Sequence, residues 1–221
     1  MADEAASDTA SDIWVNSWFT IWYEPRATIR RIVDTDAHRF VIGIPFVSGA
    51  MAAIYTQLAL STASVSSLSS VPHLPHFGTI GLTLSTIISG VLSVISLYGL
   101  AALYRWAGHI LGGTATRVEM RSALAWAEVP GLYLGLANIV AALIGSDVPG
   151  GPSAVSASGV VDFIAGIWIF VISLKCIGEV HRFSAWRALG AIILGFLAML
   201  AVLVAIVGTI WLAVVIARSM L

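Results

Sequence analysis

Five long apolar segments dominate the chain, and more polar stretches separate them. Each segment is long enough to cross a bilayer, because a transmembrane helix needs about 20 apolar residues. The pattern predicts an all-α, polytopic membrane protein: a five-transmembrane-helix bundle preceded by short N-terminal interfacial amphipathic helices. The expected spans are residues 40–62, 79–104, 122–145, 158–177 and 187–217.

The third apolar segment has two unlike faces. One face is mostly small or polar, at the spacing of three and four residues that keeps side chains together on a helix. Such a face is typical of a helix that packs against other membrane helices. An ionisable residue there is costly to bury, so Glu128 is either a functional group or a structural residue at the membrane interface. The face carries Leu124, Glu128, Gly131, Gly135, Asn138, Ala142 and Gly145.

The region before the first apolar segment is polar, and its two halves differ. Residues 1–12 are acidic and rich in alanine and serine, which predicts a disordered tail. Residues 13–39 are too polar to cross a membrane, yet Trp14, Trp18 and Trp22 recur at a spacing of four. Tryptophan favours the headgroup boundary of a bilayer. The tryptophans therefore indicate a helix that lies on the membrane surface.

A second short helix is expected to begin at Pro25, because proline fits the first turn of a helix. Its arginines favour anionic lipid at the membrane surface. We expect Trp18, Arg26, Arg30 and Arg31 to bind lipid or a partner; the alternative is a small cytosolic module that binds partners. The chain then has three regions: an acidic tail at 1–12, cytoplasmic interfacial amphipathic helices at 13–39 and a five-helix transmembrane domain at 40–221.

Composition and charge agree with a membrane protein and fix its expected orientation. The 221 residues are 58% hydrophobic and only 10% charged, against about 25% charged in soluble domains. Of the 11 lysines and arginines, all but Arg218 fall in residues 13–39, in residues 105–121 or between Lys175 and Arg187. The positive-inside rule then predicts a cytoplasmic N-terminus and a C-terminus outside. The single cysteine excludes an internal disulfide.

Polar side chains gather at the predicted cytoplasmic ends of the helices. A capping box at Thr116 and Glu119 should start a helix, and Pro130 should kink it near Glu128. We predict a buried or half-buried polar network here, either as ion pairs that anchor the bundle or as a binding site for a headgroup or partner. Its candidate members are Arg105, His109, Glu128, Lys175, Glu179 and His181.

Motifs for catalysis or metal binding are absent from the sequence, so no enzyme activity, metal or cofactor is predicted. There is no GxSxG, P-loop or CxxC motif, and no ligand spacing such as HExxH joins His109 to His181. His73 and His76 in a proline-containing connection are interpreted as polar loop residues. A membrane-embedded hydrolase would rest only on the proximity of glutamate and histidine.

A transporter or channel for an ion or small solute is the alternative function. Glu128 and Asn138 share the polar face of the third segment, and Asp162 begins a similar stripe in the fourth. These three residues would line its pathway.

Several short motifs, in order along the chain, resemble the YIP family (Ypt/Rab-interacting protein domain) in its prokaryotic-type form. The resemblance covers about residues 14–217. The motifs are Trp18 with Pro25, Arg26 and Thr28; Gly112-Gly113; Ala127 with Pro130; and the run from Gly178 to His181.

The resemblance implies a five-span bundle with a cytosolic N-terminus, here in a prokaryotic inner or cell membrane. Eukaryotic members act in early secretory traffic and bind prenylated small GTPases and one another. The long cytosolic N-terminal region of many eukaryotic members has no counterpart in this sequence. We therefore expect a non-enzymatic integral membrane protein that organises membrane or recruits partners or lipids at its cytoplasmic face. Its expected partners are membrane lipids, other proteins or a second copy of itself, and not nucleic acid.

Overall fold

The computed structural model describes residues 13–62, 79–145 and 154–219, and all elements in these ranges are helical. The predicted acidic tail, His73 and His76 lie outside the described residues. A helical segment covers residues 13–20. The helices that follow are α2 (Pro25–Asp36), α3 (Gly43–Thr62), α4 (Thr79–Ile110), α5 (Arg117–Ala127), α6 (Val129–Gly145), α7 (Ala154–Val180) and α8 (Ala185–Ser219).

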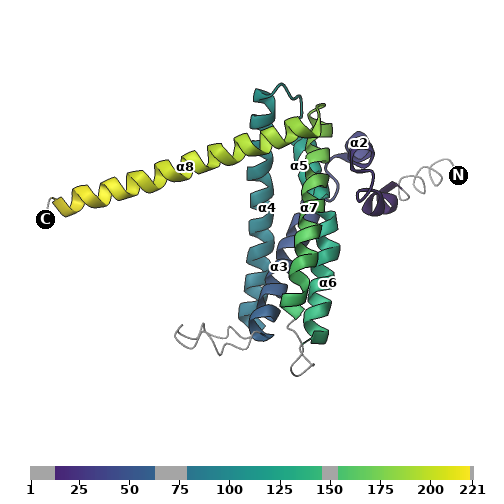
Figure 1. The fold of residues 1–221 in the computed structure, drawn as a ribbon, viewed down its shortest axis with the longest axis horizontal. Coiled ribbons are helices and arrows are strands. Elements are labelled where there is room, and N and C mark those ends of the chain that lie inside the picture. The colour runs from purple at the N-terminus through teal and green to yellow at the C-terminus, as the bar shows by residue number, and fades with distance from the viewer. Residues whose placement is uncertain (1–12, 63–78, 146–153, 220–221) are drawn as a thin grey trace.

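The bundle is formed by α3, α4, α6 and α7, which run side by side (Figure 1). The helix α3 packs against α4 and α6, and α7 packs against α6. At one end of the bundle, α5 packs against α4 and α7, and α2 packs against α5 and α7. We call this the basic end, because it carries α2, the α4–α5 connection and the α7–α8 connection.

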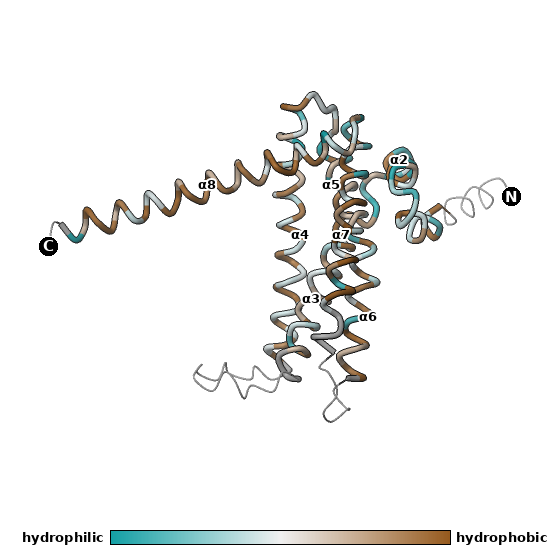
Figure 2. Tube along the Cα trace, viewed as in Figure 1, coloured by the Kyte–Doolittle hydropathy of each residue, from teal (hydrophilic) through white to brown (hydrophobic). Residues whose placement is uncertain are grey.

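Among the described residues, four helices are long and apolar enough to cross a membrane: Ile80–Ile110, Arg117–Ile144, Gly159–Val180 and Ala185–Arg218. The prediction of an all-helical, multi-pass membrane protein is therefore confirmed. The tube in Figure 2 shows the same contrast, with hydrophobic residues along the long helices and hydrophilic residues concentrated on α2. The buried core lies mainly at the basic end, where it includes Ile29, Ile32, Trp126 and Ile177.

The predicted third span is divided into two helices at Glu128. Thr116 caps α5: its Oγ1 atom accepts a 3.3 Å hydrogen bond from the Glu119 N–H, and the Glu119 carboxylate accepts one of 2.6 Å from the Thr116 N–H. This confirms the capping box predicted from the sequence. The sequence predicted a kink at Pro130, and the structure has a break between α5 and α6 at Glu128. Proline has no N–H to donate to the preceding turn, so the helix does not continue unbroken.

The last helix, α8, packs against the bundle only near its start. Gly195 lies beside Tyr104 of α4, but residues from Met199 to Arg218 are exposed, and α8 runs away from the bundle (Figure 1). The small residues Ala205 and Thr209 in this half of α8 are exposed, because the helix crosses α4 at an angle and soon leaves it.

Candidate functional site at the basic end

Four aromatic rings hold the N-terminal segment to the bundle, and we call them the aromatic cluster: Trp14, Trp18, Phe40 and Trp126. Trp126 is fully buried at its centre. Its ring centroid lies 6.2 Å from Trp14, 5.4 Å from Trp18 and 5.9 Å from Phe40. The Arg39 guanidinium lies 4.9 Å from the Trp14 ring. Trp18, a residue expected to bind lipid or a partner, thus packs mainly against other protein side chains.

A neighbouring side of the same segment exposes an apolar ridge formed by Val15, Phe19 and Tyr23. These side chains are 63%, 59% and 64% exposed. Val15 and Phe19 are four residues apart in the helical segment 13–20 and share one of its faces, and Tyr23 lies in the turn that follows. Sequence reasoning missed this ridge because it followed the tryptophans, although the same spacing was present one position later.

Helix α2 is fixed to the basic end by Glu179 near the end of α7. The Glu179 Oε1 atom accepts a 2.6 Å hydrogen bond from Arg30 Nε, and its Oε2 atom lies 3.5 Å from Arg26 Nη1. The hydrogen bond that Arg30 donates to Glu179 is the main cause that raises the pKa of Arg30. Ile29 and Ile32 of α2 are buried beneath these contacts. Two of the three arginines expected to bind lipid are therefore paired within the protein, while Arg31 is half-buried and makes no ion pair with a described residue.

His181 closes the α4–α5 connection from the side of α7. Its ring is buried and stacks on Phe183, with ring centroids 4.9 Å apart. The Nδ1 atom accepts a 3.3 Å hydrogen bond from the Ala115 N–H. Gly108 and Gly113 lie against the ring so closely that a Cβ atom on either would overlap it. The His181 ring therefore fits in this position because residues 108 and 113 are glycines.

The Ala115 carbonyl joins two further members of the predicted network. Arg105 Nε donates a 3.2 Å hydrogen bond to it, and His109 Nε2 lies 3.1 Å from it. Burial, and then the neighbouring His109, lower the pKa of His181 to about 4. The ring is therefore neutral at pH 7.

The predicted polar network is thus divided. Arg105, His109 and His181 meet around Ala115, whereas Glu179 pairs with α2. The Glu128 Oε2 atom is buried and has no hydrogen-bond partner among the described residues. Lys175 is half-buried, and no contact joins it to the others. In the described ranges, no group of three or more histidine, cysteine, aspartate or glutamate side chains could hold a metal ion.

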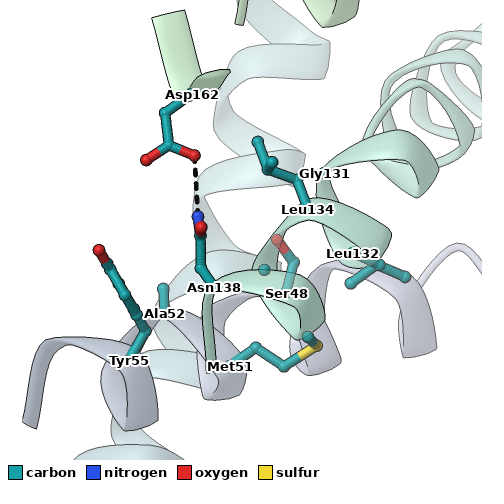
Figure 3. A pocket seen from close by; sticks show the side chains of 10 residues that line it. Ser48, Met51, Ala52, Tyr55, Gly131, Leu132, Leu134, Asn138 and Asp162 are labelled. Carbon is teal, nitrogen blue, oxygen red and sulfur yellow. Dashed lines mark hydrogen bonds between the residues drawn. The ribbon is translucent and has the colours of Figure 1, made fainter. Parts of the chain in front are cut away.

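A second polar feature lies between α3, α6 and α7, away from the basic end. Asn138 Nδ2 donates a 2.9 Å hydrogen bond to Asp162 Oδ1, and both side chains line a groove of about 260 Å³ (Figure 3). Ser48, Met51 and Tyr55 of α3 form another part of its lining. Of the three residues predicted to form a pathway, the structure brings Asn138 and Asp162 together but does not place Glu128 in this groove.

The chain was compared with models of known protein families, with curated proteins and with solved structures. The family model described as the Yip1 domain matches residues 19–217. The chain belongs to the Yip1 domain family. No curated protein and no solved structure matches it.

The Yip1 match covers the motifs that hold the basic end together. Pro25 begins α2, and the Gly112 backbone, with a φ of +86°, turns the chain after α4 in a conformation that suits glycine. Gly178 lets the Phe183 carbonyl approach, since a Cβ atom there would lie 3.1 Å from that oxygen. The Yip1 family is generally one of non-enzymatic membrane proteins associated with protein interactions.

Proposed function

We propose that this Yip1-family protein crosses the membrane five times and recruits partners or lipids at its cytoplasmic face. The observation that carries the proposal is the exposed apolar ridge of the N-terminal segment, which Thr20 joins to Thr28 of α2 by a hydrogen bond. Trp126 and Glu179 fix the segments that carry this surface to the bundle. A rigid surface loses little conformational entropy when it binds.

The five-span topology rests on packing and charge. The helix α3 has 20 residues and packs along α4 and α6, as a further span would. The basic end faces the cytoplasm by the positive-inside rule. The helix α8 is about 50 Å long, at 1.5 Å per residue, and carries no charge between Arg187 and Arg218. A helix of this length and composition is suited to hydrocarbon, so in the proposed topology α8 lies closer to parallel with the bundle than Figure 1 draws it and crosses with a tilt.

Cysteine labelling tests this topology. Ala27→Cys and Ser219→Cys would be made separately in a Cys176→Ser background. Intact cells that produce each variant would then be treated with a membrane-impermeant maleimide. Ser219→Cys should react at once, and Ala27→Cys only after permeabilisation. Reaction of both from the same side would overturn the five-span topology.

Photocrosslinking tests recruitment by the ridge. A benzoylphenylalanine at Phe19 in native membranes should form a defined adduct with a protein or a lipid, because this exposed side chain faces the recruited molecule. The same probe at Phe163, an exposed position on α7, controls for ordinary contact with bilayer lipid. The adduct at Phe19 should decrease several-fold in a Val15→Ser/Tyr23→Ser variant. Absence of an adduct beyond that seen at Phe163 would overturn the proposal.

Transport of an ion or small solute is a second candidate, favoured by the groove that holds Asn138 and Asp162. An acidic side chain that faces an intramembrane groove is a recurrent feature of ion pathways. Purified protein in liposomes should then move protons or small cations, and Asp162→Asn should abolish the flux, while Glu128→Gln should reduce it only if the pathway extends to the basic end. The absence of flux with the wild-type protein would exclude this candidate for the solutes tested.

A further inference from the structure

A second groove lies between α4 and α5 at the basic end, and three arginines line it. We call it the arginine groove. Its volume is about 220 Å³, and its lining consists of Tyr98, Ala101, Ala102, Arg105, Arg117 and Arg121. The four α4 residues follow a helical spacing of three and four, and the two α5 arginines are four apart, so each set shares one helix face.

The three guanidinium groups have no carboxylate partner among the described residues. Both salt bridges in the described part of the chain go to Glu179, from Arg26 and Arg30. Glu119 is the nearest acidic residue in sequence, but its carboxylate accepts the Thr116 N–H and lines a different groove, beside Glu179. The arginine groove therefore has an uncompensated positive charge.

Two of these arginines are held in place by the protein. Arg105 donates from Nε to the Ala115 carbonyl, which leaves its terminal nitrogens available. The Arg121 guanidinium lies over the Tyr98 ring, 4.3 Å from its centroid. Arg117 at the start of α5 is exposed. Guanidinium groups bind phosphate oxygens in a planar, two-pronged manner, and prior positioning lowers the entropic cost of such binding.

The surroundings of the groove indicate a lipid as the source of the phosphate. Ala101 and Ala102 leave space at its base because their side chains are small, and Leu100 and Trp106 nearby on α4 expose apolar side chains. A phosphate between the arginines would thus lie at the end of a membrane span, next to apolar surface that acyl chains can cover. Basic pockets between membrane helices on the cytoplasmic side are suited to anionic headgroups.

We propose that the arginine groove binds the phosphate of an anionic phospholipid in the cytoplasmic leaflet. This rests on the proposed orientation of the protein, and it names a ligand at a site separate from the apolar ridge. It adds Arg105, Arg117 and Arg121 to the residues that face the lipid headgroups.

The test measures thermal unfolding of the full chain in nanodiscs of phosphatidylcholine, with and without phosphatidylglycerol. A bound lipid stabilises the folded state by mass action, so phosphatidylglycerol should raise the Tm of the wild-type protein. Arg117→Gln/Arg121→Gln should lose more than half of that rise. Arg182→Gln/Arg187→Gln removes the same charge at the same end but outside the groove, and should keep most of it.

Further variants and ligands distinguish a loss of stability from a loss of lipid binding, and a lipid phosphate from a soluble phosphate. Arg117→Lys/Arg121→Lys keeps the charge and should retain much of the rise, even if the glutamine variant is less stable in neutral discs. Inorganic phosphate or glycerol phosphate added to neutral discs should give little rise. The proposal is overturned if both glutamine variants respond equally to phosphatidylglycerol, or if soluble phosphate reproduces the full effect. Unchanged crosslinking at Phe19 in the Arg117→Gln/Arg121→Gln variant would show that the ridge and the groove act separately.

Discussion

Arg30 of α2 donates a 2.6 Å hydrogen bond from Nε to the Oε1 atom of Glu179 on α7. The two residues are 149 positions apart in the chain. The contact joins the polar N-terminal region to the end of a membrane helix. The Glu179 side chain is only 11% exposed, whereas the Arg30 side chain is 60% exposed.

Reversing the charge of Arg30 should therefore release α2. In Arg30→Glu, two carboxylates face each other, and cleavage within α2 by proteinase K, which does not depend on arginine, should become several-fold faster in proteoliposomes. Glu179→Arg combined with Arg30→Glu should restore part of the protection, although Arg26 would then face an arginine. Equal cleavage rates in wild-type and Arg30→Glu protein would show that burial of Ile29 and Ile32 alone holds α2.

Truncation of Trp126 should be among the most destabilising changes at the basic end. Trp126→Ala removes the centre of the aromatic cluster and leaves a cavity, which typically costs about 3–5 kcal/mol. Thermal unfolding in detergent would measure the loss. Trp168→Ala on α7 is the matched control, because this tryptophan is partly exposed on the outside of the bundle; a similar loss in both variants would contradict the central position of Trp126.

A side chain at Gly108 should compete with His181 for the same space. Gly108→Ala would place a Cβ atom in overlap with the Nε2 and Cε1 atoms of His181, so the ring or α4 must move. His181→Ala makes room, and the double variant should be less destabilised than the sum of the two single variants. A double-mutant cycle of unfolding midpoints measures this coupling, and strict additivity would contradict the observed packing.

Stability should decrease with acid because His181 is buried in its neutral form. Its pKa is lowered from 6.5 to about 4, so the unfolded chain binds a proton between these values and the folded chain does not. The contribution is full above pH 6.5 and is lost as the pH falls toward 4, by roughly 3 kcal/mol. The charged or titratable groups around it are His109, Arg105 and Glu119.

Thermal unfolding between pH 7.5 and 4 would measure the acid effect. His181→Gln should flatten the pH dependence relative to the wild-type protein, while His38→Gln, at an exposed position on the same end, should not. A wild-type slope retained in His181→Gln would assign the effect to other groups.

Local features of the fold could be predicted because neighbouring residues determine them. Thr116 and Glu119 form a capping box wherever a helix begins between them, and Gly112 permits a turn that other residues resist. The apolar segments predicted spans because bilayer thickness fixes their length.

The candidate site depended on contacts between distant residues, which periodicity does not reveal. Nothing near Trp14 or Trp18 indicates that Trp126 lies between them. Glu179 could equally have paired with His109 or Lys175 at the same depth, and the choice of Arg30 follows from the docking of α2. The departure of α8 from the bundle could not be predicted, because small residues such as Gly195 permit close packing of a helix but do not determine it.

The packing of His181 also affects the order in which parts of the chain can fold during synthesis. Its ring fills the space between Gly108 and Gly113, yet it is synthesised 66 positions after Ala115, to which it is hydrogen-bonded. While the ribosome is still making α6 and α7, the α4–α5 turn therefore lacks its central support. This turn can reach its final packing only after α7 has been inserted. A chain whose synthesis stops before His181 would therefore keep an incompletely packed α4–α5 turn, which the quality-control proteases of the cell could recognise.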